Sequence, residues 1–371
     1  MVNKAAAALS RIHVLDLLRG YFLLVILLNH LHYYPSGFEW ITGQSFLYTS
    51  TAEGFFLLSG IVLGMVRGAK LIDKPFKLAA TLLLKRSLQL YITSIVLVFL
   101  FTFIGWFFVD NPGVKWGVWQ PIGEFGALIW NTLTLQYNYG WADYLRLYAI
   151  FIFFSPLAIW LLRKGYWYIL LAASFGVWTL YPFSPWPAGE YSQQFSWQLI
   201  FFTGLIVGFY WKQINTWWLA QAVRIRRIVV ASIVSISVVT LIFNALIVFG
   251  DGIPAIGPTL ASWDNALSSY FAKDRLPIPR LILFGLWFIS LYWLFWKFEK
   301  PITRRLGWLL LPFGTNSLYT YTIQAFVVFF LMLIFNDKPY PWYINLTVSL
   351  SAIALVYAAV RTKFLMKIIP R

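Results

Sequence analysis

Cysteine, histidine and charged residues are scarce in this chain of 371 residues, and each scarcity excludes a class of site. Cysteine is absent, which excludes a disulfide framework, a thiolate metal site and a cysteine nucleophile. Only three histidines are present, which argues against a histidine-rich metal cage. We therefore predict no metal site and no tightly bound cofactor. Charged residues make up 11% of the chain, whereas soluble domains contain about a quarter.

Apolar residues dominate what remains. The chain is 60% hydrophobic and 20% aromatic, with a mean hydropathy of +0.71. Since a membrane-spanning helix needs about 20 apolar residues, these values predict an all-α polytopic membrane protein with about ten transmembrane helices, forming a single domain over residues 1–371. The runs expected to span are 14–34, 46–66, 82–108, 144–162, 166–183, 195–212, 227–250, 280–297, 314–335 and 341–360.

The basic residues predict how the helices are oriented. Of the 29 lysines and arginines, 22 fall in alternate connections, which indicates cytoplasmic loops, cytoplasmic termini and a plasma (inner) membrane location. The +16 net charge is then mainly a topology signal, and we expect no nucleic acid partner. Some of the arginines are alternatively ligands for a cytosolic anion. Six basic residues fall on the outer side: Lys115, Arg146, Lys273, Arg275, Arg280 and Lys338.

The connections expected outside differ in kind from the cytoplasmic ones. Residues 124–135 are short and flanked by tryptophan, and we interpret them as a re-entrant or interfacial segment. Residues 251–279 form a long external loop containing four prolines. Residues 106–143 carry tryptophans that are either interfacial anchors or a stacking platform for a sugar: Trp106, Trp116, Trp119, Trp130 and Trp141.

Arg19 and His30 lie within the first apolar run, LDLLRGYFLLVILLNHL. Ionisable residues are costly in a membrane helix, so they favour a functional interpretation. Their separation of eleven residues is three helical turns plus about 20°, which puts both on one face with ~16 Å between them. The spacing suggests a site that recognises one end of a long ligand at Arg19 and performs chemistry at His30. The alternative is a histidine that only satisfies core packing.

Two acidic residues are candidate partners for Arg19 and His30. Asp16 precedes Arg19 by three residues and can pair with it across one turn, which is alternatively a purely structural ion pair. Glu53 begins the second helix and falls in the same outer half as His30. A carboxylate there can orient the imidazole and stabilise its cation. Gly60 and Gly64 have the small-residue spacing that permits close helix packing.

A second set of basic residues faces the cytoplasmic side. Arg67 ends the second span, and Lys85 and Arg86 lie where the third span begins. Together with Arg19 they form a candidate anion pocket that can bind phosphates through charge-assisted hydrogen bonds. Lys85 and Arg86 are alternatively topology signals only.

Several motifs are similar to those of a known group of proteins. The pattern LDLLRGYFLLVILLNH, followed by AEGFFLLSG and KRSLQLY, resembles the membrane acyltransferase-three superfamily. Within it, the chain resembles the OpgC family of osmoregulated periplasmic glucan succinyltransferases. The stretches that carry this second resemblance, in order, are AEGFFLLSG at 52–60, LRLYAIFIFFSPLAIWLLRKGYW at 145–167, FSWQLIFFTGLIVG at 195–208 and GTNSLYTYTIQAF at 314–326.

The resemblance implies roles for matching residues. His30 would be the catalytic base with Glu53 as its partner, Arg19 would contact coenzyme A, and Arg86 would contact its phosphates. Trp197 and Gln198, together with Asp16, Asn316 and Tyr319, would line the substrate pocket.

One departure concerns Gln324, because relatives often carry histidine at that position. The group that stabilises the oxyanion is not identified by the resemblance, and Ser59, Asn316 and Ser317 are the candidates.

The resemblance implies an acyltransferase that moves an acyl group from acetyl- or succinyl-CoA to a hydroxyl of a glucan or other surface glycan outside the membrane. Acyl-CoA, the glycan and membrane lipids would then be its partners. Two other classes remain open: a transporter or flippase without covalent chemistry, and a structural or sensor subunit.

Overall fold

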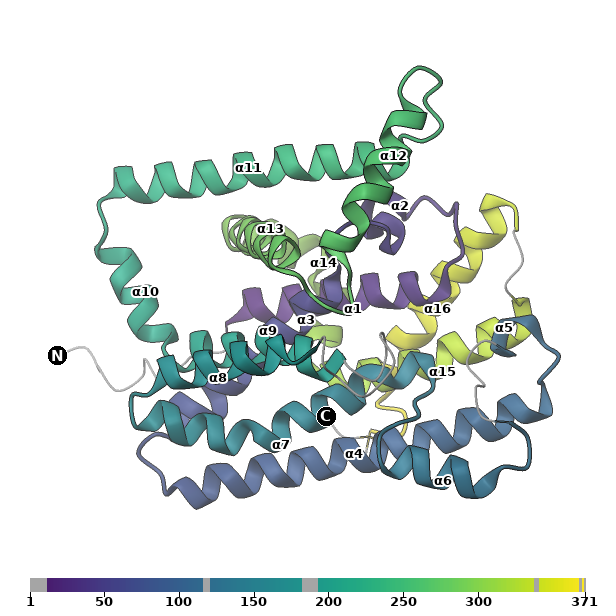
Figure 1. The fold of residues 1–371 in the computed structure, drawn as a ribbon, viewed down its shortest axis with the longest axis horizontal. Coiled ribbons are helices and arrows are strands. Elements are labelled where there is room, and N and C mark those ends of the chain that lie inside the picture. Colours follow the sequence, from purple (N-terminus) through teal and green to yellow (C-terminus); the bar gives the residue numbers. More distant parts are fainter. Residues whose placement is uncertain (1–11, 116–120, 182–192, 337–339, 367–368, 370–371) are drawn as a thin grey trace. The chain divides into compact units, whose positions relative to one another are not determined.

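A computed structural model describes residues 12–115, 121–181, 193–336, 340–366 and 369, and every regular element in these ranges is helical (Figure 1). Within them, eight helical segments are long and apolar enough to cross a membrane. These segments are α1 (His13–Leu31), α3 (Thr51–Leu63) with its continuation η2 (Gly64–Gly68) and η3 (Ala69–Leu71), α4 (Phe76–Phe107), α7 (Asp143–Arg163), α11 (Val223–Phe249), α13 (Ile278–Lys297), α15 (Ser317–Phe335) and α16 (Trp342–Thr362).

The eight segments coincide with eight of the ten predicted spans, which confirms an all-helical fold. The other two predicted spans form α8 (Trp167–Thr179) and α9 (Gln193–Phe209), of 13 and 17 residues. At 1.5 Å per residue these helices are ~20 and ~25 Å long, shorter than the ~30 Å hydrocarbon core. The total of ten spans and the orientation of the termini remain predictions.

The remaining elements are short or amphipathic. They are α2 (Glu39–Thr42), η1 (Gly43–Ser45), α5 (Pro112–Lys115), α6 (Phe125–Leu133), η4 (Gly140–Ala142), α10 (Trp211–Ala220), α12 (Gly257–Leu267), η6 (Ser268–Phe271) and α14 (Glu299–Thr315). The segment interpreted as re-entrant or interfacial thus contains the nine-residue helix α6. The predicted loop 251–279 is largely helical, since it contains α12 and η6.

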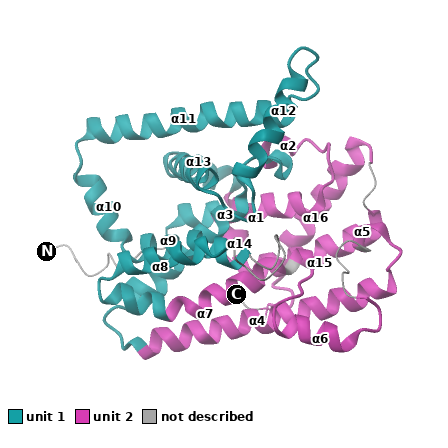
Figure 2. Ribbon diagram, in the orientation of Figure 1, with its two compact units in different colours: residues 1–18, 43–76, 157–306 teal, residues 19–42, 77–156, 307–371 magenta. Residues whose placement is uncertain are grey.

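The chain divides into two compact units, coloured separately in Figure 2. Unit 1 consists of residues 1–18, 43–76 and 157–306, and unit 2 consists of residues 19–42, 77–156 and 307–371. Each unit is assembled from three separate stretches of chain, so the units are not consecutive domains along the sequence.

Unit 1 is built around a close approach of α3 and α9. Gly60 of α3 and Gly64, the first residue of η2, lie against α9, where a Cβ atom would overlap the carbonyl oxygens of Phe201 and Leu205. The contact is reciprocal, because a Cβ at Gly204 or Gly208 of α9 would overlap carbonyl oxygens of α3. The predicted packing role of the α3 glycines is confirmed, and α9 supplies a matching pair with the same spacing.

Hydrogen bonds between side chains join α11 and α13 in the same unit. The Ser290 hydroxyl donates to Ser237 Oγ (2.8 Å), Ser237 donates to the Leu286 carbonyl (3.0 Å), and Trp287 Nε1 donates to Thr240 Oγ1 (2.9 Å). The outer surface of α11 is apolar, with Val239 and Ile242 64% and 63% exposed. Apolar surface of this kind is suited to lipid rather than to water.

Unit 2 brings one end of α1, α15 and α16 together. The Tyr33 hydroxyl, just after α1, donates to the Asn336 carbonyl at the end of α15 (2.8 Å), and Asn345 near the start of α16 donates to the Pro35 carbonyl (3.0 Å). Tyr319, near the start of α15, donates to the Ala359 carbonyl near the end of α16 (3.0 Å). Helices α1 and α15 therefore run parallel, and α16 runs antiparallel to them.

Two of the basic residues predicted on the outer side are buried near the start of helices. Arg146 lies in α7 with 2% of its surface exposed, and Arg280 lies in α13 with 3% exposed. Both residues lie in the first turn of a predicted span, 144–162 and 280–297, and their placement on the outer side remains a prediction. Lys338 lies outside the described residues.

The tryptophans of residues 106–143 differ in their exposure to the surroundings. Trp130 of α6 is 64% exposed, as an interfacial anchor would be, whereas Trp141 is 2% exposed and packs against Phe329 (ring centroids 5.9 Å apart). Trp141 is thus a core residue of unit 2. Trp116 and Trp119 lie outside the described residues.

The α3–α9 contact predicts that the effect of a glycine-to-alanine substitution on stability depends on its position. Gly60→Ala should destabilise the protein by about 1–3 kcal/mol, because the new Cβ forces the two backbones apart. Gly285→Ala, in α13 with open space around the added Cβ, should be neutral or stabilising by up to ~1 kcal/mol. Thermal unfolding in detergent, followed by tryptophan fluorescence, measures both; equal effects would contradict the packing role.

Candidate active site

His30 lies in the last turn of α1, where part of its side chain stays accessible. Its neighbours along the chain are buried, with Asn29 8% and Leu31 1% exposed. The helix ends directly afterwards because His32 adopts a left-handed backbone conformation (φ 53°). The half-buried imidazole therefore lies at the end of a buried helix.

An aromatic stack fixes the plane of the His30 ring within unit 2. The Tyr144 ring lies parallel to it, with centroids 6.5 Å apart and an interplanar angle of 12°. Tyr321 of α15 meets the Tyr144 ring edge-on, at 5.8 Å and 67°. Both tyrosines are buried, so neither ring is free to swing away from the stack.

Asp143 holds the two tyrosines in this arrangement. It begins α7, and its Oδ1 accepts a hydrogen bond from the Tyr144 amide (2.7 Å). The Tyr321 hydroxyl lies 3.2 Å from the same oxygen and 3.0 Å from the carbonyl of Trp141. The carboxylate thus contacts the backbone of Tyr144 and the side chain of Tyr321, and the Tyr144 ring lies between those of Tyr321 and His30.

The segment following α1 secures the residue beside His30. The Tyr34 hydroxyl donates to Asn29 Oδ1 (2.8 Å) and lies 2.8 Å from the Thr42 hydroxyl. Burial raises the pKa of Tyr34 to about 12, with a further increase from the charge of Glu39 that opposes the lowering by Thr42. Tyr34 therefore stays protonated near neutral pH and continues to donate to Asn29.

Glu53 lies in unit 1 and is fully buried, with both carboxylate oxygens occupied. Oε1 accepts a hydrogen bond from Nε of Arg280 (2.6 Å) and forms an ion pair with its Nη2 (2.5 Å). Oε2 accepts the Ser50 amide (2.9 Å) and the Ser50 hydroxyl, which forms a capping box at the start of α3. Arg280 also donates to the Phe271 carbonyl (2.6 Å).

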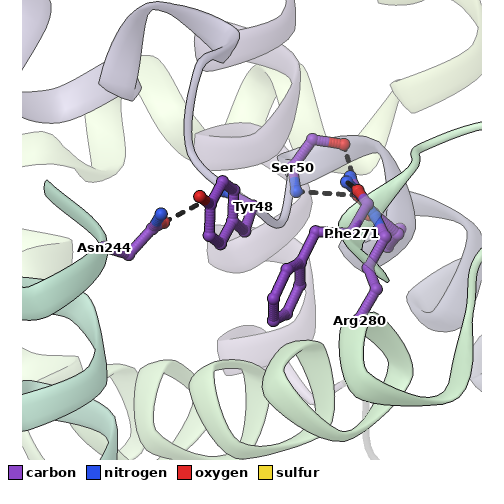
Figure 3. Close-up of polar contacts among 6 residues, drawn as sticks. Tyr48, Ser50, Asn244, Phe271 and Arg280 are labelled. Carbon is purple, nitrogen blue, oxygen red and sulfur yellow. Dashed lines mark hydrogen bonds and ion pairs between the residues drawn. The ribbon is translucent and has the colours of Figure 1, made fainter. Parts of the chain in front are cut away.

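Tyr48 continues this network. Its amide donates to Asn244 Oδ1 (3.0 Å), as Figure 3 shows, and its hydroxyl donates to Asp264 Oδ1 (2.8 Å). Its ring stacks on Phe271 with centroids 4.5 Å apart. Burial and the Asp264 carboxylate raise the pKa of Tyr48 well above its usual value, so the hydroxyl remains a donor. The start of α3 is thereby fixed to α11, α12 and η6.

The structure assigns the predicted base and its predicted partner to different units. His30 belongs to unit 2 and Glu53 to unit 1, so their contact remains a prediction. Within unit 1, Arg280 rather than a histidine neutralises Glu53. Sequence analysis missed this pairing because 227 residues separate Arg280 from Glu53 and no local pattern connects them.

The predicted anion pocket is also divided. Arg67 belongs to unit 1 and is half-buried in the π-helical turn η2, a type of turn frequent at functional sites. Arg19, Lys85 and Arg86 belong to unit 2, where Lys85 is exposed and the other two are half-buried. The pocket that would combine the four residues remains a prediction.

Trp197 and Gln198 are core residues of unit 1. Trp197 is 1% exposed and meets the Phe56 ring edge-on at 5.4 Å. Gln198 joins α9 to α8: its Oε1 accepts the Ser174 hydroxyl (2.6 Å), and its Nε2 donates to the carbonyls of Ser174 (2.7 Å) and Phe195 (3.0 Å). The amide of Gln198 is therefore satisfied by the protein itself.

The other predicted pocket residues have structural surroundings as well. Tyr319 is buried and donates to the Ala359 and Phe364 carbonyls, while Asn316 precedes α15 and donates to the Pro312 carbonyl (3.0 Å). Asp16 is buried in the first turn of α1. Of the oxyanion candidates, Ser59 is buried, while Asn316 and Ser317 are half-buried.

Sequence reasoning missed Asp143, Tyr144 and Tyr321. A signal was present for the first two, since Asp143 is an acidic residue directly before a long apolar run. Tyr321 carried none, because an aromatic residue within an apolar helix is most often ordinary packing. In the described part of the chain, no group of three histidine, cysteine or acidic residues could hold a metal ion.

The Glu53–Arg280 pair predicts that replacing Arg280 destabilises the protein far more than replacing an exposed arginine. Arg280→Met leaves a buried carboxylate without its cation and should destabilise the protein by about 3–5 kcal/mol. Arg275→Met is a matched control, because Arg275 is 58% exposed and 3.8 Å from Asp274, and it should cost at most ~1 kcal/mol. Chemical unfolding in detergent compares them, and a mild effect at Arg280 would contradict the buried pair.

The chain was compared with known proteins. The family model described as OpgC protein matches residues 11–368, so it covers segments of both units. No curated protein and no solved structure matches the chain. The family match extends over nearly the whole sequence, and its name agrees with the resemblance carried by the motifs. The chain belongs to the OpgC protein family.

Proposed function

We propose that this protein is an integral membrane O-acyltransferase that transfers a succinyl or acetyl group from cytoplasmic acyl-CoA to a hydroxyl of a glucan or related surface glycan. The observation that carries the proposal is the presentation of His30. It is a half-buried imidazole at the end of a buried helix, and its ring lies parallel to that of Tyr144. Membership in the OpgC protein family supports glucan modification by acyl transfer.

In the proposed reaction His30 acts as a general base. Its imidazole takes the proton of the attacking hydroxyl, and the oxygen forms a bond to the thioester carbonyl carbon. The carbon–sulfur bond then breaks, and the coenzyme A thiolate takes the proton from the imidazolium. The products are the ester and free coenzyme A, and the histidine returns to its starting form. An acyl-histidine intermediate is the variant of this scheme.

The Tyr144 stack limits the orientations that the imidazole can adopt. A base held in one plane delivers its lone pair along one direction, and orientation of this kind contributes to rate. Asp143 and Tyr321 contact Tyr144, so their effect on His30 is indirect. We assign Tyr144, Asp143 and Tyr321 as positioning residues for His30.

The donor end of the proposed site is the basic set Arg19, Arg67, Lys85 and Arg86. Guanidinium and ammonium groups bind the phosphates of coenzyme A through charge-assisted hydrogen bonds. The ~16 Å between Arg19 and His30 along α1 suits an extended pantetheine arm, with phosphates at one end and thioester at the other. A transporter for glycans would also need basic residues, but it would not consume a thioester.

The role of His30 predicts a loss of chemistry without a loss of fold. His30→Ala should reduce acyl transfer at least ~100-fold, the lower range of general-base contributions, and leave acyl-CoA binding and thermal unfolding unchanged. The measurement is release of free thiol from succinyl- or acetyl-CoA by purified protein with glucan. His32→Asn is the control, because His32 is exposed and asparagine tolerates its left-handed backbone. Near-normal turnover in His30→Ala would exclude it as the base.

The ring stack predicts a second effect on turnover. Tyr144→Leu removes the parallel ring and should lower kcat by about 10- to 100-fold with little change in KM, because His30 loses its fixed plane. Its pH–rate profile should shift as well, whereas Tyr144→Phe keeps the ring and should retain both kcat and the profile. If the leucine and phenylalanine variants behave alike, the stack does not position His30.

A further inference from the structure

Gln324 is a buried amide for which the described part of the chain provides no partner. It lies in the middle of α15 with 1% of its surface exposed, and neither Oε1 nor Nε2 has a hydrogen-bond partner among the described residues. Gln198, the other buried glutamine discussed above, has both amide atoms bonded to Ser174. The contrast shows that burial alone does not leave a glutamine unpaired in this protein.

An unpaired amide is costly in such surroundings. Each unsatisfied buried donor or acceptor costs about 1–3 kcal/mol, and hydrocarbon offers no replacement. Leucine or methionine would fill the same volume of an apolar helix without that cost. A polar side chain retained here is therefore better explained by a bound group than by packing.

The position of Gln324 on α15 connects it with the His30 stack. It follows Tyr321 by three residues, so the two side chains emerge from neighbouring positions on one side of the helix, about 5–6 Å apart at their Cβ atoms. The Tyr321 ring touches Tyr144, and the Tyr144 ring stacks on His30. Two turns further along, Met332 Sδ lies 3.7 Å from the Tyr33 hydroxyl, just after α1. Gln324 thus lies between two points at which α15 meets the surroundings of His30.

We propose that Gln324 binds the substrate that reaches His30, through a group that both donates and accepts a hydrogen bond. The Gln324 carbonyl would accept from this group, and the Gln324 amide nitrogen would donate to it. A secondary amide of the pantetheine arm has this chemistry, and so does a sugar hydroxyl. The inference rests on the proposed function, because it takes acyl-CoA and glycan as the substrates.

The test replaces the amide with an apolar side chain of similar length. Gln324→Met should raise the melting temperature of the ligand-free protein by roughly 2–4 °C, since the unsatisfied amide is removed. The same variant should bind its ligand about 10- to 100-fold more weakly, because the bound group loses its partner. A gain in stability joined to a loss of affinity is the signature of a binding residue; a packing residue would not give it.

Calorimetry with coenzyme A, adenosine 3′,5′-bisphosphate and glucan identifies which substrate carries the group that Gln324 binds. Weaker binding of coenzyme A, with unchanged binding of adenosine 3′,5′-bisphosphate, which lacks the pantetheine arm, assigns Gln324 to the donor. Weaker binding of glucan with unchanged binding of coenzyme A assigns it to the acceptor. Thr322→Val is the matched control: Thr322 is buried on the same helix and its hydroxyl already donates to the Leu318 carbonyl (3.0 Å), so binding of all probes should persist.

Unchanged affinity for coenzyme A and glucan in Gln324→Met would overturn the inference, and so would a melting temperature that falls. Such results leave the proposed function intact if the wild-type protein still releases thiol from acyl-CoA. If the wild-type protein neither binds coenzyme A nor consumes the thioester, the proposed function fails, and the inference about Gln324 fails with it. Should Gln324→Met not fold, Gln324→Leu provides the same comparison.

Discussion

Polar side chains within apolar helices need a partner, because hydrocarbon supplies none and water is far away. This constraint governs the described parts of both units. In unit 1 it places an arginine and a serine on the Glu53 carboxylate, and it joins α8 to α9 through Gln198. In unit 2 it places Asp143 between two tyrosines. The polar residues thereby determine which helices pack together, while the apolar residues supply the area that is buried.

Satisfying the buried polar groups has a different consequence in each unit. Glu53 is saturated by groups of its own unit, so its charge stabilises the start of α3. Asp143 instead bonds the Tyr144 amide and the Tyr321 hydroxyl, and the ring of Tyr144 lies parallel to the half-buried imidazole of His30. A closed network suits a structural element, whereas a network that ends at an accessible base suits a site of reaction.

Much of the fold could be predicted from the sequence. Long apolar runs specify helices almost regardless of their neighbours, so every one of the eight spans was anticipated. The spacing of Gly60 and Gly64 also predicted a close contact, since it depends only on helical geometry. The predicted runs 166–183 and 195–212 also correspond to helices, α8 and α9, of 13 and 17 residues.

Less of the candidate site could be predicted, because its contacts join residues far apart in the chain. The sequence separation of Glu53 and Arg280 is 227 residues, and no local pattern connects them. Tyr144 and Tyr321 meet through the packing of α7 against α15, which periodicity does not reveal. His30 was found because a titratable group inside an apolar run is conspicuous on its own, without knowledge of any partner.

The separation of Glu53 from Arg280 has a consequence for how the protein is made. Helix α3 leaves the ribosome long before α13, so the ion pair cannot exist while the first part of unit 1 is being inserted into the bilayer. During that interval the carboxylate has only Ser50 as a bonding partner from the network. The growing chain must keep the Glu53 carboxylate out of the hydrocarbon until Arg280 has been synthesised. Completion of unit 1 is therefore tied to late translation rather than to the insertion of its first helix.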